Sequence, residues 1–380
     1  MEQSWQTRRR PTLFGWSASR FKFPSRHYNC IDMGPPALKY ARTSDGVNIA
    51  YLALGEGPTL VFASNIFGEA QGYELPWPHY REVTDMLVRR GYRVVRYDVR
   101  GMGYSDRDVS DTSLAARIKD LEAVIQALEL RQFDLAGLDL GAATALAFAA
   151  EHPGRVSRLI AISPWVSGQR MFDLTDLRMV SATEPNAERE WELFSKLIGT
   201  SVTSFVDKEL GELTATMIRR STTPRGLFAY YDASREIELS SMLGRIKAPT
   251  LVIHETEFPF GSRELCQQVA AMIPNARFVV VKGPSIAGRM HDEHVDVIDS
   301  FLKEGALTPS PREPAHTLTA REAQVLAHVA AGLSNKEIAA KLSLSVSTIE
   351  RHLVNIYTKI GARGRADATA FALRNGLAEV

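Results

Sequence analysis

Cysteines and long apolar runs are both scarce in this sequence. Only two cysteines occur among 380 residues, Cys30 and Cys266, and two thiols so far apart cannot form a disulfide framework, which fits a reducing cytosol. Neither stands in a spacing typical of metal ligands, so a metal site is not expected. No apolar run approaches the roughly 18 residues of a membrane-spanning helix. We therefore expect a cytoplasmic protein that uses no membrane, metal or cofactor.

A strong charge of one sign is also missing, because the whole chain carries a net charge of +1. The charges are unevenly distributed, however. Residues 317–380 hold eight Lys/Arg against five Asp/Glu, and residues 1–33 are also basic, so the central part of the chain is acidic. A mildly basic C-terminal module on an acidic body is a weak indication of a polyanionic partner.

The composition, 45% apolar and 23% charged, is that of an ordinary globular protein, which excludes disordered, collagen-like and coiled-coil chains. At 380 residues the chain is too long for one compact core, so two domains of unequal size are expected. Closely spaced prolines predict an extended linker over residues 304–316. This linker would separate a large domain, residues 36–303, from a small one, residues 317–380.

The first 35 residues are predicted to be a disordered extension. Arg8-Arg9-Arg10 superficially resembles a twin-arginine export signal, but Arg20 and Lys22 follow where such a signal needs an apolar region. The composition also suits a transit peptide, or a start of translation at Met33. The expectation of a cytoplasmic protein stands.

Short β-branched runs alternate with helical patterns throughout the large domain. Thr59–Ser64, Arg93–Asp98 and Phe133–Asp139 are examples of the runs, and such alternation predicts a parallel sheet covered by helices on both faces. Residues 165–245 break this rhythm with several aromatic-rich helices between two strands. An insertion there should form a lid over the carboxyl edge of the sheet, where open α/β folds bind ligands.

The small domain carries clear helix signals. Thr319–Glu322 and Ser334–Glu337 each fit a capping box, and Ser345 is a natural N-cap for a third helix. That third helix has an apolar stripe at helical spacing, made of Val346, Ile349, Leu353, Ile356 and Ile360. Two short helices, a tight turn and a longer third helix are typical of a helix-turn-helix that reads double-stranded DNA.

The segments Leu318–Ala339 and Ser347–Leu353 closely resemble the LuxR-type DNA-binding domain of bacterial regulators. The resemblance implies a four-helix module whose third helix reads DNA and whose fourth helix commonly supports a homodimer. It places a phosphate contact at Lys336. The residues that we assign to DNA binding are Asn335, Lys336, Ser345, Ser347, Thr348, Glu350, Arg351, Asn355 and Lys359. The alternative, a helical bundle for protein contacts, does not account for helix signals in register with this pattern.

In the large domain, Gly137-Leu138-Asp139-Leu140-Gly141 stands between an apolar run and a helix, which predicts a nucleophile elbow. The chain from Leu38 to Leu302 resembles the α/β-hydrolase fold, and more narrowly the bacterial regulators that fuse such a domain to a LuxR-type module. The expected fold class is therefore α/β, an α/β-hydrolase fold with a helical lid, followed by a small all-α helix-turn-helix domain.

The catalytic positions that the resemblance implies are poorly matched. The elbow holds aspartate instead of serine, and aspartate is a nucleophile in haloalkane dehalogenases and epoxide hydrolases, so this change alone does not exclude hydrolysis. The position expected for the acid holds Phe258, with Glu257 as the nearest carboxylate. The position expected for the histidine holds Ile286, whereas His291 and His294 should fall at or inside the following helix.

A pocket for a small molecule is expected beneath the lid. The loop Ser64–Gly68 stands where the family has its oxyanion loop, and its backbone could donate together with the amide of Leu140. The residues expected to line the pocket are Asn65, Ile66, Asp139 and Leu140. Asp139 is expected to contact the ligand; the other interpretation is that it only caps the helix that follows.

The sequence therefore predicts a DNA-binding transcriptional regulator whose catalytically degraded hydrolase-fold domain senses a small molecule. One alternative is an active hydrolase with an Asp nucleophile, dehalogenase-like or epoxide-hydrolase-like, fused to a DNA-binding module. Another is a scaffold whose large domain only dimerises. The hydrolase requires His291 or His294 within hydrogen-bond reach of Asp139, directly or through one water.

Overall fold

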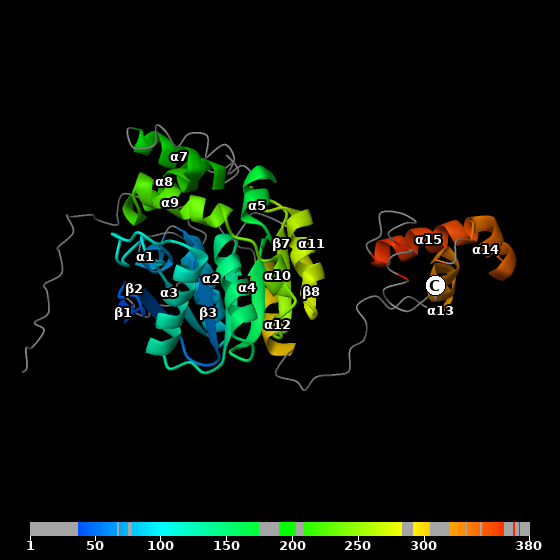
Figure 1. Ribbon diagram of the computed structural model, residues 1–380, viewed down its shortest axis with the longest axis horizontal. Coiled ribbons are helices and arrows are strands. Elements are labelled where there is room, and N and C mark those ends of the chain that lie inside the picture. Colours follow the sequence, from blue (N-terminus) through cyan, green and yellow to red (C-terminus); the bar gives the residue numbers. More distant parts are fainter. Residues whose placement is uncertain are drawn as a thin grey trace, which may run out of the picture. The chain divides into compact units, whose positions relative to one another are not determined.

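The computed structural model describes most of the chain. The described residues are 37–66, 68–74, 78–174, 190–202, 208–282, 292–304, 320–330, 333–342 and 344–360, with Ala368 and Ala372. Contacts divide the chain into two compact units between Gly305 and Ala306 (Figure 1). Of the helices within the described residues, none combines the length and the apolar character needed to cross a bilayer.

The N-terminal unit is built on an eight-stranded sheet with the order β1-β2-β4-β3-β5-β6-β7-β8. Its strands are β1 (Lys39–Arg42), β2 (Asn48–Leu54), β3 (Thr59–Ala63), β4 (Arg93–Tyr97), β5 (Phe133–Leu138), β6 (Val156–Ile162), β7 (Thr250–Glu255) and β8 (Ala276–Val281). All pairings from β4 to β8 are parallel, whereas β1 and β2 are antiparallel additions at one edge. The predicted parallel sheet is thus confirmed for six of the eight strands.

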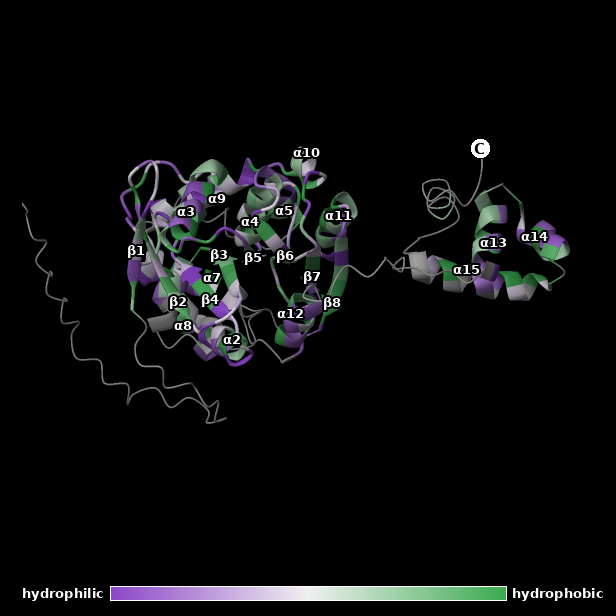
Figure 2. Ribbon diagram, turned by 90° about the horizontal axis from the view of Figure 1, so that it is seen from below, coloured by the Kyte–Doolittle hydropathy of each residue, from purple (hydrophilic) through white to green (hydrophobic). Residues whose placement is uncertain are grey.

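Helices cover both faces of this sheet. They are α1 (Glu69–Glu74), α2 (Pro78–Arg89), α3 (Leu114–Ala127), α4 (Leu140–Glu151), α10 (Ser240–Leu243), α11 (Arg263–Met272) and α12 (Asp292–Glu304). Figure 2 shows α3, α4, α10 and α11 on one side of the sheet and α2 and α12 on the other. Every residue of α4 from Leu140 to Ala150 is buried, as expected for a helix that is apolar on all sides. The helix that begins at the elbow is therefore held firmly.

The insertion between β6 and β7 contains α5 (Gly168–Leu174), α7 (Trp191–Val202), α8 (Lys208–Ser221) and α9 (Pro224–Arg235), followed by α10. It is fixed to the loop that follows β4, because the Gly103 amide donates to the Ser221 carbonyl over 2.8 Å and the Thr222 hydroxyl donates to the Gly101 carbonyl over 3.3 Å. The insertion therefore covers the carboxyl ends of the strands, as the three helices α7, α8 and α9 do in Figure 1.

The C-terminal unit contains α13 (Ala320–Ala330), α14 (Asn335–Leu342) and α15 (Val346–Ile360). The buried side chains of its core are Val325, Leu326, Val329, Ile338, Ala339, Ile349, Leu353, Ile356, Ala368 and Ala372. The predicted stripe of the third helix is confirmed at its centre, but it is wrong for Val346, which is 39% exposed. The side chain of Ile360 lies outside the described part. Val346 is the first residue of α15, so it lies at the end of the stripe.

Candidate functional site

The elbow between β5 and α4 has the backbone that the sequence predicts. Asp139 has φ 49° and ψ −112°, a conformation that a non-glycine residue adopts only when its surroundings impose it. A Cβ atom on Gly137 would lie 2.5 Å from the Gly141 carbonyl oxygen, and one on Gly141 would lie 2.4 Å from the carbonyl oxygen of Ala63. Both glycines are therefore required by close backbone approach.

The Asp139 side chain is buried, with 4% exposure. Its Oδ1 accepts a hydrogen bond of 3.0 Å from the indole Nε1 of Trp165. Burial raises the pKa of Asp139 to about 7, against the opposing effects of the Trp165 indole and the Leu140 amide, and the Glu255 carboxylate raises this pKa further. The side chain makes no capping hydrogen bond to α4. The interpretation of Asp139 as a simple helix cap is therefore wrong.

Two amides of the loop after β3 are already engaged. The Asn65 amide donates to Glu69 Oε1 over 3.1 Å, and the Ile66 amide donates to the side-chain oxygen of Asn65 over 2.8 Å. Glu69 is held in turn by Arg96 through a buried ion pair of 2.8 Å. Side chains of the loop itself and of α1 therefore occupy two of the amides that were expected to donate to an oxyanion.

The four residues expected to line the pocket lie on two neighbouring segments. β3 and β5 are neighbouring parallel strands with Ala63 opposite Gly137, so the loop that follows β3 and the start of α4 lie side by side. Asn65, Ile66, Asp139 and Leu140 are all buried. This places a carboxyl group, an amide side chain and two apolar side chains at the carboxyl edge of the sheet.

The position expected for the catalytic acid is apolar in the structure as well. Phe258 is buried and packs edge-on against Phe260 with ring centroids 5.6 Å apart. Ile286 and His291 lie outside the described residues. No carboxylate therefore stands at the predicted acid position.

A different acid and histidine meet nearby. The Nε2 atom of His294, at the start of α12, lies 3.3 Å from Oε1 of Glu255, and both side chains are fully buried. The other carboxylate oxygen of Glu255 accepts a hydrogen bond of 3.3 Å from the Ser163 hydroxyl. Sequence reasoning missed Glu255. The available signal was its place at the end of an apolar strand, since the carboxyl ends of parallel strands share one edge.

This pair does not complete a triad through direct contact. Among the described residues, no histidine forms a hydrogen bond with Asp139, whose side-chain partner is Trp165. The Nδ1 atom of His294 has no hydrogen-bond partner in the same ranges. The edge of the sheet thus holds two acids, of which Glu255 raises the pKa of Asp139, and His294 lies beside Glu255.

In the C-terminal unit, the two helices expected to contact DNA are capped as predicted. The Ser334 amide donates to Glu337 over 2.7 Å and the Glu337 amide donates to the Ser334 hydroxyl over 3.4 Å, which is a capping box. The Ser345 hydroxyl accepts a hydrogen bond of 3.1 Å from the Thr348 amide. The other predicted capping box begins at Thr319, which lies outside the described residues.

The residues assigned to DNA binding are accessible where the structure describes them. Lys336, Ser345 and Glu350 are exposed, and Asn335 and Thr348 are half-buried. The assigned residues whose side chains lie outside the described part are Ser347, Arg351, Asn355 and Lys359. The exposed residues lie at the start of α14, immediately before α15 and in the first half of α15, and these two helices pack against each other.

Comparison with known proteins finds two families in the chain. Residues 68–284 match the family described as "alpha/beta hydrolase fold", and residues 316–372 match "Bacterial regulatory proteins, luxR family". The AB hydrolase superfamily protein YisY of Bacillus subtilis (strain 168) is 26% identical over 229 residues, which are 57% of this chain and 80% of that protein.

Other similarities cover one unit each. Response regulator Rre1 of Synechocystis sp. (strain ATCC 27184 / PCC 6803 / Kazusa) is 44% identical over 72 residues, 19% of this chain and 30% of that protein. The crystal structure of the esterase RhEst1 from Rhodococcus sp. ECU1013 has a TM-score of 0.60 and 20% identity, covering 70% of this chain and 98% of that chain. At this identity the structural likeness concerns the fold alone.

Proposed function

Because the chain belongs to the alpha/beta hydrolase fold family and ends in a DNA-binding domain of the luxR family of bacterial regulatory proteins, we propose that it is a cytoplasmic transcriptional regulator that senses a small molecule. In this proposal the hydrolase-fold unit binds the molecule without turning it over. The luxR-type unit binds double-stranded DNA, as a homodimer on two related half-sites.

The observation that carries the proposal is the environment of Asp139. Its carboxyl group is buried, bonded to Trp165, and has its pKa raised to about 7 by burial, so a large part of it is protonated and not nucleophilic at neutral pH. Two of the amides expected to stabilise an oxyanion, those of Asn65 and Ile66, are engaged by the side chains of Glu69 and Asn65. An acyl substrate would therefore find no ready nucleophile and fewer free donors.

The same environment suits binding. A buried carboxyl group with a pKa near neutrality can accept a hydrogen bond or donate one, and protonated acids in apolar sites are known to donate. We expect a ligand with a small apolar body and one carbonyl, hydroxyl or carboxyl group that reaches Asp139. The ligand acts on regulation only if it favours one conformation of the protein over another.

The test is a binding screen on the full-length chain. Small carboxylates, esters, lactones and aromatics are screened by thermal shift, because a specific ligand raises the apparent stability by mass action. Each hit is then measured by calorimetry on the wild type and on Asp139→Asn, which keeps an oxygen for Trp165. We expect the variant to bind about 10–100-fold more weakly, a loss of roughly 1.4–2.7 kcal/mol.

Asp232→Asn is the matched control, because Asp232 is an exposed carboxylate on α9 of the same unit. It should leave ligand affinity unchanged. Both variants should bind DNA like the wild type when no ligand is present. A ligand whose affinity is the same for the wild type and Asp139→Asn would contradict the assignment of Asp139.

The second candidate is an active hydrolase, and the buried pair of Glu255 and His294 favours it. In such an enzyme the Asp139 carboxylate would attack a carbon of an alkyl halide or epoxide, release halide or open the ring to an alkoxide, and form an ester. A water deprotonated by His294 would then attack the ester carbonyl, which restores the carboxylate and releases the alcohol.

This candidate has a distinct signature. In an active hydrolase the wild type releases product repeatedly, and His294→Gln slows this release strongly. An ester on Asp139 then accumulates in the variant and is visible by mass spectrometry. This result would replace the sensor proposal. The absence of turnover together with specific binding supports the sensor.

A further inference from the structure

The strand β8 forms one edge of the sheet, and within the described residues it pairs only with β7. The carbonyl groups of Asn275 and Val281 accept hydrogen bonds of 3.3 and 3.1 Å from amides of β7 and of the residue after it. Because the backbone groups of a strand point alternately to its two sides, the amides of Phe278 and Val280 point away from the sheet. Within the part of the chain that the structure describes, no strand pairs with these donors, which lie along the edge of the sheet.

The two edges of the sheet differ in how they are protected. β1, at the far edge, is four residues long and exposes Lys39 and Arg42, and short, charged strands are the usual protection against unwanted pairing. β8 has a single charge, Arg277, followed by the apolar run Phe278–Val281, most of which is only half-buried. An edge of this composition is suited to pairing with a further strand.

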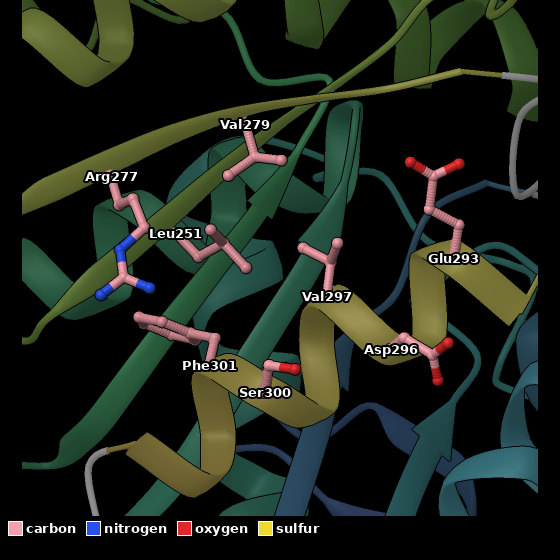
Figure 3. A pocket seen from close by; sticks show the side chains of 8 residues that line it. All are labelled: Leu251, Arg277, Val279, Glu293, Asp296, Val297, Ser300 and Phe301. Atoms are coloured by element: carbon pink, nitrogen blue, oxygen red, sulfur yellow. The ribbon is translucent and has the colours of Figure 1, made fainter.

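A groove of about 430 Å³ runs between β8 and α12 (Figure 3). Four apolar side chains contribute to its lining: Leu251, Val279, Val297 and Phe301. The ends of the groove carry opposite charges. Arg277, which pairs with Glu304, lies beside Phe301 at one end, and Glu293 and Asp296 lie at the other (Figure 3). Asp296 is already paired with Arg90, so Glu293 is the acidic group that a second copy would meet.

The direction of α12 relative to β8 follows from one ion pair. Arg277, near the start of β8, pairs over 2.7 Å with Glu304, the last residue of α12. The start of α12, with Glu293 and Asp296, therefore lies toward the end of β8. A second β8 strand placed antiparallel along the free edge would bring its own Arg277 to that acidic end.

We propose that β8 and α12 form the face through which two copies of this chain associate, with their β8 strands antiparallel across a twofold axis. A twofold contact requires a surface that complements itself. A groove with a basic end and an acidic end complements a second copy of the same groove that runs in the opposite direction. The outward amides of Phe278 and Val280 gain carbonyl partners, and the partner's Arg277 faces Glu293.

The reason why two copies are needed rests on the proposed function. A helix-turn-helix regulator reads two half-sites with two modules, and one module with eight Lys/Arg against five Asp/Glu makes few phosphate contacts. Joining two modules raises the effective concentration of the second one at its half-site. Association through the large units supplies this link.

The test is sedimentation velocity of the full-length chain over a wide range of concentration. Arg277→Glu places like charges at both ends of the groove and should raise the dimer dissociation constant at least about tenfold. Glu293→Arg should do the same, whereas the double variant should return to within about threefold of the wild type, since the charges are then exchanged. Arg42→Glu, a charge reversal on the opposite edge, is the matched control and should have no effect.

Val280→Pro is an independent variant, because it removes an outward amide without removing a bond to β7, and it should also weaken the dimer. A wild type that is monomeric throughout, or a dimer unaffected by Arg277→Glu and Val280→Pro, would overturn the proposal. Binding of a single half-site and of the screened ligand should stay intact in Arg277→Glu. Loss of DNA binding in a wild type that still dimerises through this face would instead contradict the proposed function.

Discussion

Two helix N-termini of this protein illustrate different uses of the same structural position. α4 begins after Asp139, which has a positive φ of 49° and makes no capping hydrogen bond. α15 begins after Ser345, which is exposed and accepts a hydrogen bond from the Thr348 amide. A residue that caps its helix contributes to stability. A residue that leaves the cap unmade and holds a strained backbone costs stability, which suggests that the position is kept for function.

The largest loss of stability is expected from a substitution at the strained elbow. In Gly141→Ala the new Cβ atom would lie 2.4 Å from the backbone oxygen of Ala63, and backbone cannot move aside like a flexible side chain. We expect a loss of about 3 kcal/mol or more in the free energy of unfolding, measured by urea denaturation. Gly244→Ala is the control, because nothing lies within 4 Å of its position. Equal stability of the two variants would show that the elbow is not tightly constrained.

The second prediction concerns the cost of burying Asp139. Its folded-state pKa is about 7, whereas an unfolded Asp loses its proton near pH 4. The folded state therefore binds the proton more tightly, and this stabilisation is complete below about pH 4 and is lost as pH rises through 7. Asp139→Asn removes this dependence and keeps an oxygen for Trp165. At pH 8 the variant should be more stable than the wild type by up to about 4 kcal/mol, since the two pKa values differ by about three units.

Unfolding curves at several pH values test this prediction. The extra stability of Asp139→Asn over the wild type should shrink as the pH falls and vanish in acid. Asp98 is also buried, with its pKa raised to about 7, but it is present in both proteins, so the difference between them reports on Asp139. A variant that is less stable than the wild type at pH 8 would mean that the ionised carboxylate is stabilised by its surroundings.

The third prediction concerns α15, the helix expected to read DNA. Arg351→Ala should cost about 1–3 kcal/mol on the cognate site and relax the sequence preference, because an arginine at a base edge discriminates between bases. Lys336→Ala should weaken all sequences about equally and lower the salt dependence, as loss of a phosphate contact does. Fluorescence anisotropy with cognate and random DNA separates the two. Equal losses on both DNAs for Arg351→Ala would place it among the phosphate contacts.

The sequence predicts the elbow and the capping box at Ser334, but it does not predict the pair of Glu255 and His294, and the reason is physical. The elbow and the capping box at Ser334 depend on residues three or four positions apart, so local spacing is enough to find them. The pair of Glu255 and His294 depends on the end of β7 meeting the start of α12. Both residues stand away from the positions that the family pattern predicts, so only the folded arrangement shows that they meet.

Two further details required the three-dimensional structure. The Ile66 amide is occupied because the Asn65 side chain turns back onto it, which depends on a rotamer that no spacing rule predicts. Val346 fits the apolar stripe of α15 by spacing, yet it is 39% exposed, and spacing alone does not show which residues of a stripe are covered.

The smallest effect is expected at the cap of α15. Ser345→Ala removes the hydroxyl that accepts from the Thr348 amide and should destabilise the first turn by about 1 kcal/mol. Hydrogen exchange at the amides of this turn should become faster, and DNA affinity should fall by a similar factor on every sequence, since a frayed helix presents all of its contacts less well. Glu350→Ala is the control, because this exposed side chain lies beyond the cap, and its loss should change sequence preference and leave exchange at the first turn unaltered. If Ser345→Ala instead altered the preferred sequence without faster exchange, the hydroxyl would be a direct DNA contact, and the contrast between a capping Ser345 and a non-capping Asp139 would no longer hold.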